Sequence, residues 1–198
     1  LGSSAAMAVA IGRALGLDGA ALAEAAMASE TVIHGKPSGL DHTVSIAGGF
    51  GLFTRQGGLT ALRAAPLRLV IGHTGKARDT KGRVARVAQL YGERTDEVRE
   101  RFLAIETLVA RGADAVARGS YGELGQAMNE NQRHLEALDV SCVEIERMCA
   151  IARDAGAFGA KLTGGGGGGC VIAVGNDAPV ADAWRGAGYE TFSATVSA

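Results

Sequence analysis

The sequence predicts an α+β protein, and three features of its patterning carry that prediction. Apolar residues recur at helical spacing over several long segments, short runs of strand-forming residues lie between them, and Gly and Pro punctuate the chain. Hydrophobic residues make up 47% of the 198 residues and charged residues 21%, values typical of a globular protein and not of a disordered one. A chain of this length is expected to form one or two domains.

The chain opens with two predicted helices. The first covers 4–16, with Ser3 or Ser4 as its N-cap and Gly16 as its end. The second begins at Asp18, another favourable capping residue, and continues to about residue 34.

A glycine- and proline-containing loop, HGKPSG, leads from the second helix into a shorter one. Asp41 is expected to cap this short helix, which ends at Gly48-Gly49. Two strands follow at 50–54 and 59–63, and Gly57-Gly58 forms the turn between them.

The rest of the chain combines strand patterns with long helices. A strand at 67–73 is followed by helical periodicity that is most regular around 95–117, where Thr95 or Asp96 marks the start. Six consecutive glycines at 164–169 are flanked by strand-like residues. Further helices are expected at 121–138, 141–155 and 178–187, and further strands at 156–163, 170–174 and 189–196.

The pattern divides the chain near residues 64–66. Residues 66–198 contain strands and helices in the number that a complete domain requires. Residues 1–65 supply helices and two strands whose apolar faces have no further sheet to cover them. We therefore expect a partial domain at 1–65 and a complete one at 66–198.

Charge and cysteine usage argue against several classes of protein. The net charge is −1 and Lys and Arg form no stripe, so we expect no nucleic-acid partner and no anionic membrane surface as partner. No apolar run reaches the roughly 18 residues of a membrane span, and no basic leader is present. Cys142, Cys149 and Cys170 fit no metal motif or disulfide framework, which predicts a reducing, cytoplasmic location. Cys142 and Cys149 are expected to be buried apolar residues.

Two of three candidate functional segments lie in the first 50 residues. Leu1-Gly2-Ser3-Ser4 runs into a helix N-terminus, where free N–H groups favour anions, although alone it is better explained by a serine cap. Glu30 and Asp41 lie eleven residues apart around the loop. One could ligate a hard cation while the other orients or deprotonates a hydroxyl; a solvated helix residue and an N-cap are the structural alternatives.

The third segment is KLTGGGGGGC, residues 161–170. Six glycines remove every Cβ, so backbone N–H groups can approach a ligand closely. A flexible linker is the alternative, but the position between strand-like segments favours a functional loop. The spacing matches neither a Walker loop nor a dinucleotide-binding GxGxxG motif, and His34 and His42 lack a third ligand for zinc.

Taken in order, the three segments resemble the GHMP family of small-molecule kinases. The resemblance rests on LGSSAA at 1–6, IHGKPSGLDHTVSIAGG at 33–49 and KLTGGGGGGC at 161–170. The middle segment is similar to that of the mevalonate kinases, whereas galactokinases, homoserine kinases and phosphomevalonate kinases differ there. The resemblance implies the GHMP kinase fold. Residues 1–65 would be a partial, ribosomal-protein-S5-like N-terminal domain that binds ATP and Mg²⁺, and 66–198 a ferredoxin-like C-terminal domain.

The resemblance also implies an activity and a set of site residues. The activity is the ATP- and Mg²⁺-dependent phosphorylation of mevalonate to 5-phosphomevalonate, a step of isoprenoid precursor synthesis. The implied phosphate-binding residues are Gly2, Ser3, Ser4, Gly164, Gly165, Gly166 and Gly167. The other implied residues are Ser4 and Glu30 as Mg²⁺ ligands, Asp41 as the general base, Thr80 beside the acceptor hydroxyl, and Ser38 and Arg78 as substrate contacts.

Some family features have no counterpart here, and other assignments stay open. The adenine-binding segment and the N-terminal strand with the lysine partner of Asp41 are missing, so we expect an N-terminally truncated chain that is inactive alone. Gly165 stands where relatives often carry alanine, which we expect to be tolerated. A homodimer is possible. The alternatives are another GHMP kinase acting on a different small alcohol and a non-catalytic ligand sensor, against which the retained carboxylates argue.

Overall fold

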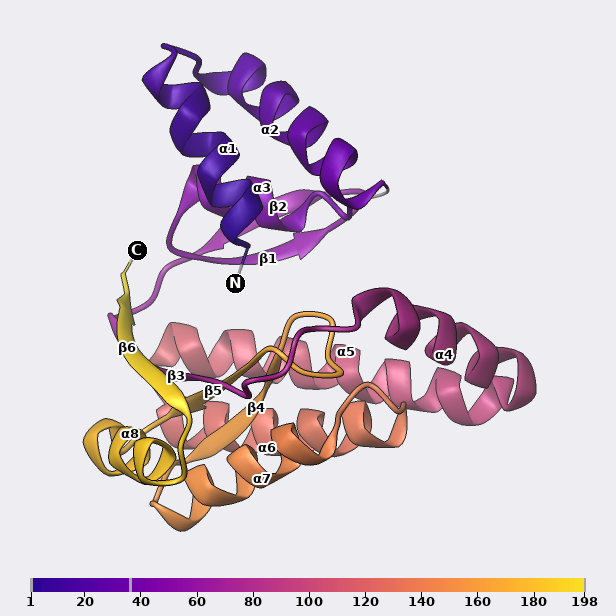
Figure 1. The fold of residues 1–198 in the computed structure, drawn as a ribbon, viewed down its shortest axis with the longest axis vertical. Helices are drawn as coiled ribbons and strands as arrows, with labels where there is room; N and C mark the ends of the chain where they lie inside the picture. Colours follow the sequence, from indigo (N-terminus) through magenta and orange to yellow (C-terminus); the bar gives the residue numbers. More distant parts are fainter. Residues whose placement is uncertain (1, 36, 198) are drawn as a thin grey trace. The chain divides into compact units, whose positions relative to one another are not determined.

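The computed structural model describes residues 2–35 and 37–197, and the chain in it forms two compact units (Figure 1). The first unit takes in the chain up to Arg63 together with Ser197, and the second runs from Ala64 to Val196. No helix within the described ranges is long and apolar enough to cross a membrane.

The first unit combines helices with a small antiparallel sheet. Its elements are α1 (Ser3–Ala14), α2 (Gly19–His34), α3 (Leu40–Ala47), β1 (Phe50–Thr54) and β2 (Gly58–Leu62). Strands β1 and β2 pair with Phe50 opposite Leu62 and Thr54 opposite Gly58. Each of these elements was predicted from the sequence, with ends that differ by at most two residues where the prediction set them.

Helices α1 and α2 lie side by side and are joined by a short turn (Figure 1). The chain reverses at Gly16, whose φ of 80° is the left-handed conformation that glycine adopts most easily at a helix end. Val9, Leu22 and Ala26 form the core between the helices. Gly12 allows a close approach, because a Cβ at this position would lie 2.5 Å from Leu22 Cδ1.

Two helix starts differ from the prediction. Helix α1 begins at Ser3 after Gly2, whose φ is 61°, so the N-cap is Gly2 and the predicted serine cap is wrong. Helix α3 begins at Leu40 after Gly39, whose φ is 89°, so Asp41 lies inside the first turn and does not cap it. Both caps have a left-handed backbone, which costs glycine little and other residues about 1–2 kcal/mol. The predicted cap of α2 is correct, since Asp18 occupies that position.

The described part of the second unit is built on a four-stranded antiparallel sheet. Its strands, in the order β4-β5-β3-β6, are β3 (Leu67–His73), β4 (Gly159–Thr163), β5 (Cys170–Val174) and β6 (Glu190–Val196). Ile71 on β3 faces Ile172 on one side and Phe192 on the other, and Ile172 faces Lys161 on β4. This strand order is that of a ferredoxin-like fold, as the sequence predicted.

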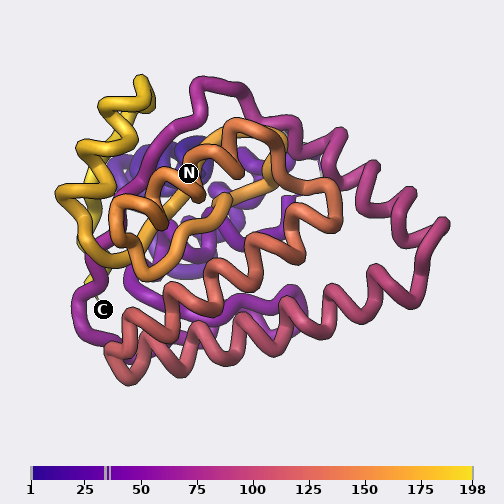
Figure 2. Tube along the Cα trace, turned by 90° about the horizontal axis from the view of Figure 1, so that it is seen from below, coloured from indigo at the N-terminus to yellow at the C-terminus, as the bar shows by residue number. Residues whose placement is uncertain are grey.

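Long helices complete the second unit. They are α4 (Thr80–Glu93), α5 (Thr95–Arg118), α6 (Tyr121–Ala137), α7 (Val143–Asp154) and α8 (Asp177–Gly186). Helices α5 and α6 run side by side along much of their length (Figures 1 and 2). The sequence pattern predicted the start of α5 at Thr95 or Asp96, which is confirmed, and gave no bounds for α4.

The main hydrophobic core lies between the sheet and helices α7 and α8. It includes the fully buried Trp184, whose indole N–H donates to the Met148 carbonyl oxygen at 2.9 Å. Gly72 on β3 leaves room for both of these side chains, because a Cβ there would lie 2.5 Å from Met148 Cε and 2.7 Å from the indole ring.

Strand β4 lies at one edge of the sheet, and side-chain amides of α6 bind its backbone. Asn129 Oδ1 accepts a hydrogen bond from the Ala160 N–H at 3.1 Å, and Gln132 Oε1 accepts one from the Leu162 N–H at 2.8 Å. Two backbone donors of an edge strand are thereby satisfied by a neighbouring helix.

The cysteines are free thiols. Cys149 is fully buried as predicted, and desolvation raises the pKa of its thiol to about 12. Cys142 is only half-buried, because it precedes α7 at the surface, so its predicted burial is wrong in degree. Burial still raises the pKa of the Cys142 thiol above its usual value.

Candidate functional site

The N-terminus of α1 lies against the first turn of α3. A Cβ placed on Gly2 would be 3.6 Å from Cγ of Asp41 and 3.7 Å from its Oδ1. The Asp41 side chain therefore sits beside the end of α1 that carries the N–H groups of the first turn and the positive end of the helix dipole. Asp41 itself is exposed to solvent. Two segments that the sequence analysis singled out separately are neighbours in space.

Glu30 belongs to the buried stripe of α2. Leu22, Ala26 and Glu30 follow one another at four-residue spacing, and Glu30 is only 2% exposed. Leu22 meets Gly12 near the turn between the helices. A helix rises about 1.5 Å per residue, so the path from Leu22 to Glu30 matches the path from Gly12 back to Ser4. Glu30 therefore lies at the end of the helix pair where α1 begins.

These groups have the chemistry of a site for a cation and a phosphate. A helix N-terminus supplies N–H donors to phosphate oxygens, and carboxylate and hydroxyl oxygens are the ligands of a hard divalent cation. No set of three or more His, Cys, Asp or Glu side chains within residues 2–35 and 37–197 is placed to hold a metal ion. A divalent cation at Glu30 would take further oxygen ligands from a bound phosphate, which is how Mg²⁺ is commonly held in such sites.

Ser38 lies just before α3. Its Oγ accepts a hydrogen bond from the Leu40 N–H at 3.2 Å, which orders the turn that leads to Asp41. Gly39 between them is buried and has a φ of 89°, a left-handed conformation in which a side chain would be strained. Met27 Cε and Phe53 Cζ each lie 3.6 Å from a Cβ built on it, which is ordinary packing distance, so this turn packs against both side chains.

The glycine run of the second unit folds into a loop between β4 and β5. Gly166 to Gly169 are buried, whereas Gly164 is exposed and Gly165 half-buried. The Gly167 N–H donates to the Val140 carbonyl and the Gly169 N–H to the Lys76 carbonyl, each at 2.9 Å. The Gly167 amide is therefore used inside the protein, and the assignment of Gly167 to the cofactor site stays a prediction.

Arg78 and Thr80 pack against this glycine loop. A Cβ on Gly164 would lie 2.9 Å from Nη1 of Arg78, and one on Gly165 would overlap the Thr80 side chain. Arg78 and Thr80 are both exposed, and Thr80 is the first residue of α4. The structure thus brings Arg78, Thr80 and the outer part of the loop together.

Two supporting features were not predicted. Asp79 caps α4, its Oδ1 accepting the Gly82 N–H at 3.0 Å, and so positions Thr80. Gln132 donates to Ser141 and Glu146 from inside α6, close to the Val140 carbonyl that binds the glycine loop. Gln132 could have been identified from the sequence, because it is a polar residue within the apolar stripe of its helix.

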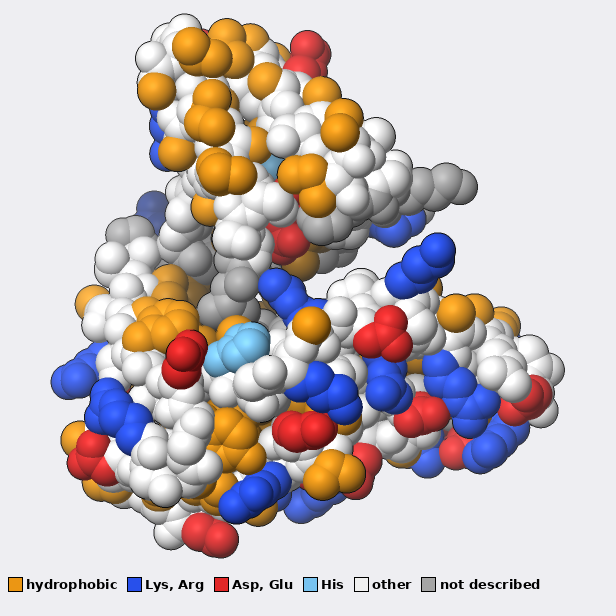
Figure 3. Space-filling model, in the orientation of Figure 1, with side chains coloured by type: hydrophobic (Ala, Val, Ile, Leu, Met, Phe, Trp, Pro, Cys, Tyr) orange, Lys and Arg blue, Asp and Glu red, His pale blue; other side chains and the backbone are white. Residues whose placement is uncertain are grey.

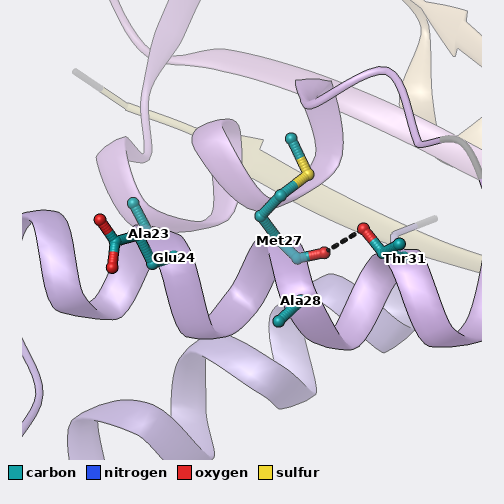
Figure 4. A pocket seen from close by; sticks show the side chains of 5 residues that line it. All are labelled: Ala23, Glu24, Met27, Ala28 and Thr31. Atoms are coloured by element: carbon teal, nitrogen blue, oxygen red, sulfur yellow. Dashed lines mark hydrogen bonds between the residues drawn. The ribbon is translucent and has the colours of Figure 1, made fainter.

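A wide depression of about 590 Å³ lies on α2 and carries no chemistry of this kind. The residues that line it all come from one helix: Ala23, Glu24, Met27, Ala28 and Thr31 (Figure 4). The Thr31 hydroxyl donates to the Met27 carbonyl at 2.8 Å, so it is used within the helix. None of the predicted site residues lines this depression.

The surface drawn in Figure 3 differs between the units. Over the second unit, basic and acidic side chains are interspersed, whereas apolar side chains gather over α1 and α2 of the first (Figure 3). On α1, Met7, Ile11 and Leu15 are 60%, 54% and 75% exposed and share one face of the helix.

Comparison with known proteins defines the class of this chain. Residues 113–192 match the family model described as GHMP kinases C terminal. The matched segment covers α6, α7, the glycine loop and β5, together with α8 and part of β6. Residues 113–192 therefore form part of a GHMP kinase C-terminal domain.

Within this family the similar curated proteins are mevalonate kinases. The mevalonate kinase of Pyrococcus horikoshii is 39% identical over 185 residues, which cover 88% of this chain and 55% of that protein. The human mevalonate kinase is 32% identical over 157 residues, 75% of this chain and 39% of the relative. The chain therefore spans about half the length of the curated relatives it matches.

Solved structures agree with this fold. The mevalonate kinase of L. major in complex with R-mevalonate superimposes with a TM-score of 0.92 at 29% identity, over 99% of this chain and 65% of that one. The enzyme of methicillin-resistant Staphylococcus aureus gives a TM-score of 0.70 at 28% identity, over 100% of this chain and 67% of that one. These similarities confirm the predicted fold class.

Proposed function

We propose that this chain carries the metal-binding and catalytic carboxylates of an ATP-dependent mevalonate kinase, which converts mevalonate to 5-phosphomevalonate in isoprenoid precursor synthesis. One observation carries the proposal: the Asp41 carboxylate lies beside the N-terminus of α1, at the same end of the helix pair as Glu30. The similarity to curated mevalonate kinases, and to the L. major enzyme whose structure holds R-mevalonate, supports the choice of substrate.

We assign the binding of the ATP phosphates to the start of α1. The N–H groups of Gly2, Ser3 and Ser4 lie at the positive end of the helix, where a phosphate is stabilised. The Ser4 hydroxyl and the Glu30 carboxylate would hold Mg²⁺, which supplies charge neutralisation to the phosphates when bound. Glu30 suits this task because α2 holds it in a buried position, where its orientation is restricted.

Asp41 is the proposed general base. A carboxylate beside the phosphate-binding helix end can accept the proton of the primary hydroxyl of mevalonate as that oxygen bonds to the γ-phosphorus. Positioning and charge neutralisation dominate phosphoryl transfer, so the main contribution of Asp41 is to align the hydroxyl with the phosphate. The first turn of α3 and the packing at Gly39 keep the carboxylate in place.

The substrate contacts that we assign lie on separate segments of the chain. Arg78 offers a planar guanidinium suited to the carboxylate of mevalonate, Ser38 is assigned as a further substrate contact, and Thr80 is assigned to the acceptor hydroxyl. Direct phosphate contacts are assigned to Gly164 and Gly165, which reach the surface. The buried Gly166 and Gly167 shape the loop that presents them.

Several coarser assignments accompany this proposal. Residues 1–65 would be part of the GHMP N-terminal domain, which binds ATP and Mg²⁺, and 66–198 the C-terminal domain. We place the protein in the cytoplasm and allow for a homodimer. Galactokinase-like activity is the alternative within the family, but the Lactococcus lactis galactokinase shares only the fold, at 18% identity and a TM-score of 0.63.

Turnover measurements test the proposal. The longest chain that the gene encodes around these residues is assayed with ATP and mevalonate, galactose, homoserine or phosphomevalonate, and we expect turnover with mevalonate. Asp41→Asn should lower kcat by about 10²–10⁴-fold. Its unfolding midpoint should stay unchanged, because the side chain is exposed.

A matched control and a second variant sharpen the result. Asp18→Asn changes another carboxylate of the same unit at a helix cap, where Asn is equally suitable, and should keep full turnover. Glu30→Gln should raise the Mg²⁺ concentration required for half-maximal rate. Normal turnover in Asp41→Asn, or preference for another alcohol, contradicts the proposal.

A further inference from the structure

A cavity of about 220 Å³ opens between α5, α6 and β4, away from the predicted site residues. Its lining is mostly apolar and comprises Leu108, Val109, Gly112, Leu124, Ala127, Met128, Asn131 and Lys161. Gly112 leaves part of this space open, since the nearest atom to a Cβ there would be Leu124 Cδ1 at 3.7 Å. Val109 is 49% exposed, so this space opens to solvent and is a surface pocket, which a small ligand can enter.

Lys161 brings a charge to this apolar space. Ala160 and Leu162, its neighbours on β4, belong to the core beneath α7 and α8, so Lys161 points to the opposite face of the strand. Its ammonium donates to the Leu162 carbonyl oxygen at 2.7 Å. Burial lowers the pKa of Lys161 to about 8, which still leaves most of the amine charged at neutral pH.

The neighbouring acidic side chains do not neutralise this ammonium. Glu130 on α6 pairs with Arg111 of α5 at 2.9 Å, and Asp114 and Glu123 both pair with Arg118. From α7, Cys149 is the group that interacts with Lys161, and its thiol is neutral. Within the described residues Lys161 forms no ion pair. Lys161 is half-buried, so its ammonium is partly desolvated. A bound anion would offset the cost of that desolvation.

We propose that this cavity binds a medium-chain aliphatic carboxylate. The carboxylate would accept hydrogen bonds from the Lys161 ammonium and the Asn131 side-chain amide, and the hydrocarbon chain would lie along the apolar side chains of α5 and α6. One ammonium matches one negative charge, whereas a phosphate ester carries nearly two and the lining offers no second cation. Taking ~30 Å³ as the volume of one water in the liquid, the cavity holds about seven non-hydrogen atoms, close to the roughly eight of hexanoate.

Ligand-observed NMR titration of the 198-residue chain tests this site, with sodium hexanoate as the probe and 1-hexanol as its uncharged counterpart. We expect saturable binding of hexanoate. Lys161→Met keeps the length of the side chain and removes its charge, and should weaken hexanoate binding at least about tenfold while leaving hexanol binding within about threefold. Lys81→Met, which removes an exposed lysine of α4, should change neither.

A second variant keeps the test decisive if Lys161→Met does not fold. Gly112→Leu fills the cavity from α5 and keeps the Lys161 side chain, and it replaces a glycine inside a helix, which favours folding. This variant should abolish the binding of both probes. The proposal is overturned if hexanoate shows no saturable binding, if it binds no more tightly than hexanol, or if Gly112→Leu leaves it unaffected. These measurements do not involve turnover, so they are independent of the proposed kinase function.

Discussion

Replacing Gln132 by leucine should destabilise the second unit strongly, although Gln132 is remote from any proposed substrate contact. Its side chain is 2% exposed and joins three segments. Its Nε2 donates to Glu146 Oε1 at 2.6 Å and to Ser141 Oγ at 3.1 Å, and its Oε1 accepts the Leu162 N–H at 2.8 Å. The hydrogen bonds that join α6 to α7 and to the edge of the sheet therefore depend on this one side-chain amide.

The size of the effect follows from these bonds. A hydrogen bond to a charged group contributes about 1.5–3 kcal/mol and a neutral one about 1 kcal/mol. Leucine makes none of them, and it leaves the buried Leu162 N–H without an acceptor, which costs about 1–3 kcal/mol more. Since leucine fills much of the same volume with apolar atoms, part of the loss is recovered. We expect Gln132→Leu to lower the free energy of unfolding by about 3–5 kcal/mol.

Urea unfolding followed by tryptophan fluorescence measures this change. Trp184 is the single tryptophan of the sequence and is fully buried in the second unit, so its emission reports on that unit. With a slope of about 2 kcal/mol per molar urea, the midpoint should fall by about 2 M. Gln126→Leu, at an exposed position of the same helix, serves as the control and should shift it little. A loss below about 1 kcal/mol in Gln132→Leu would refute the reasoning.

Three further predictions concern titration and packing in the second unit. Burial lowers the pKa of Lys161 from 10.5 to about 8 in the folded chain. Between these two pH values the unfolded chain binds more protons than the folded chain. The free energy of unfolding should therefore rise with pH over this range, by up to about 3 kcal/mol. Denaturant titrations of wild type and Lys161→Met from pH 7 to 10 check this, and equal slopes would contradict it. Cys149, with a thiol pKa of about 12, should resist iodoacetamide at pH 8 until the chain is unfolded, as peptide mass spectrometry can show; rapid labelling of the folded chain would count against its burial. Gly165→Ala should cost about 1–3 kcal/mol, because the added methyl overlaps the Thr80 side chain. The additional change Thr80→Ala should recover most of this loss, and a double-mutant cycle without coupling would show that the two residues do not meet.

The positions of the helices and strands could be predicted because their signals are local. Periodic apolar residues and glycine breaks placed β1 and β3 at their observed residues and the other predicted elements within a few residues of theirs. The helix starts were harder, since Gly2 and Gly39 compete with nearby serine and aspartate for the capping position. In both helices the N-cap is a glycine with a left-handed backbone. Capping rules that favour Ser and Asp do not predict a glycine at this position.

The candidate site was also predicted only in part from the sequence. The residue types and their spacing identified Glu30, Asp41 and the glycine run as candidates, and the order of the motifs identified the family. The spacing did not show that Asp41 lies against Gly2, because that contact requires α1 and α3 to pack. Nor did it show that the Gly167 amide is bound to Val140, a residue 27 positions earlier in the chain.

By itself, then, the sequence determined the α+β class, the family and the candidate chemistry, since these depend on residue types in order along the chain. Tertiary structure alone decided which groups are available. It buried Glu30 in the α1–α2 hairpin, used part of the glycine loop for internal hydrogen bonds, and left Lys161 charged in an apolar cavity. The physical reason is that burial and hydrogen-bond partners depend on contacts between residues far apart in the chain, which local patterns do not encode.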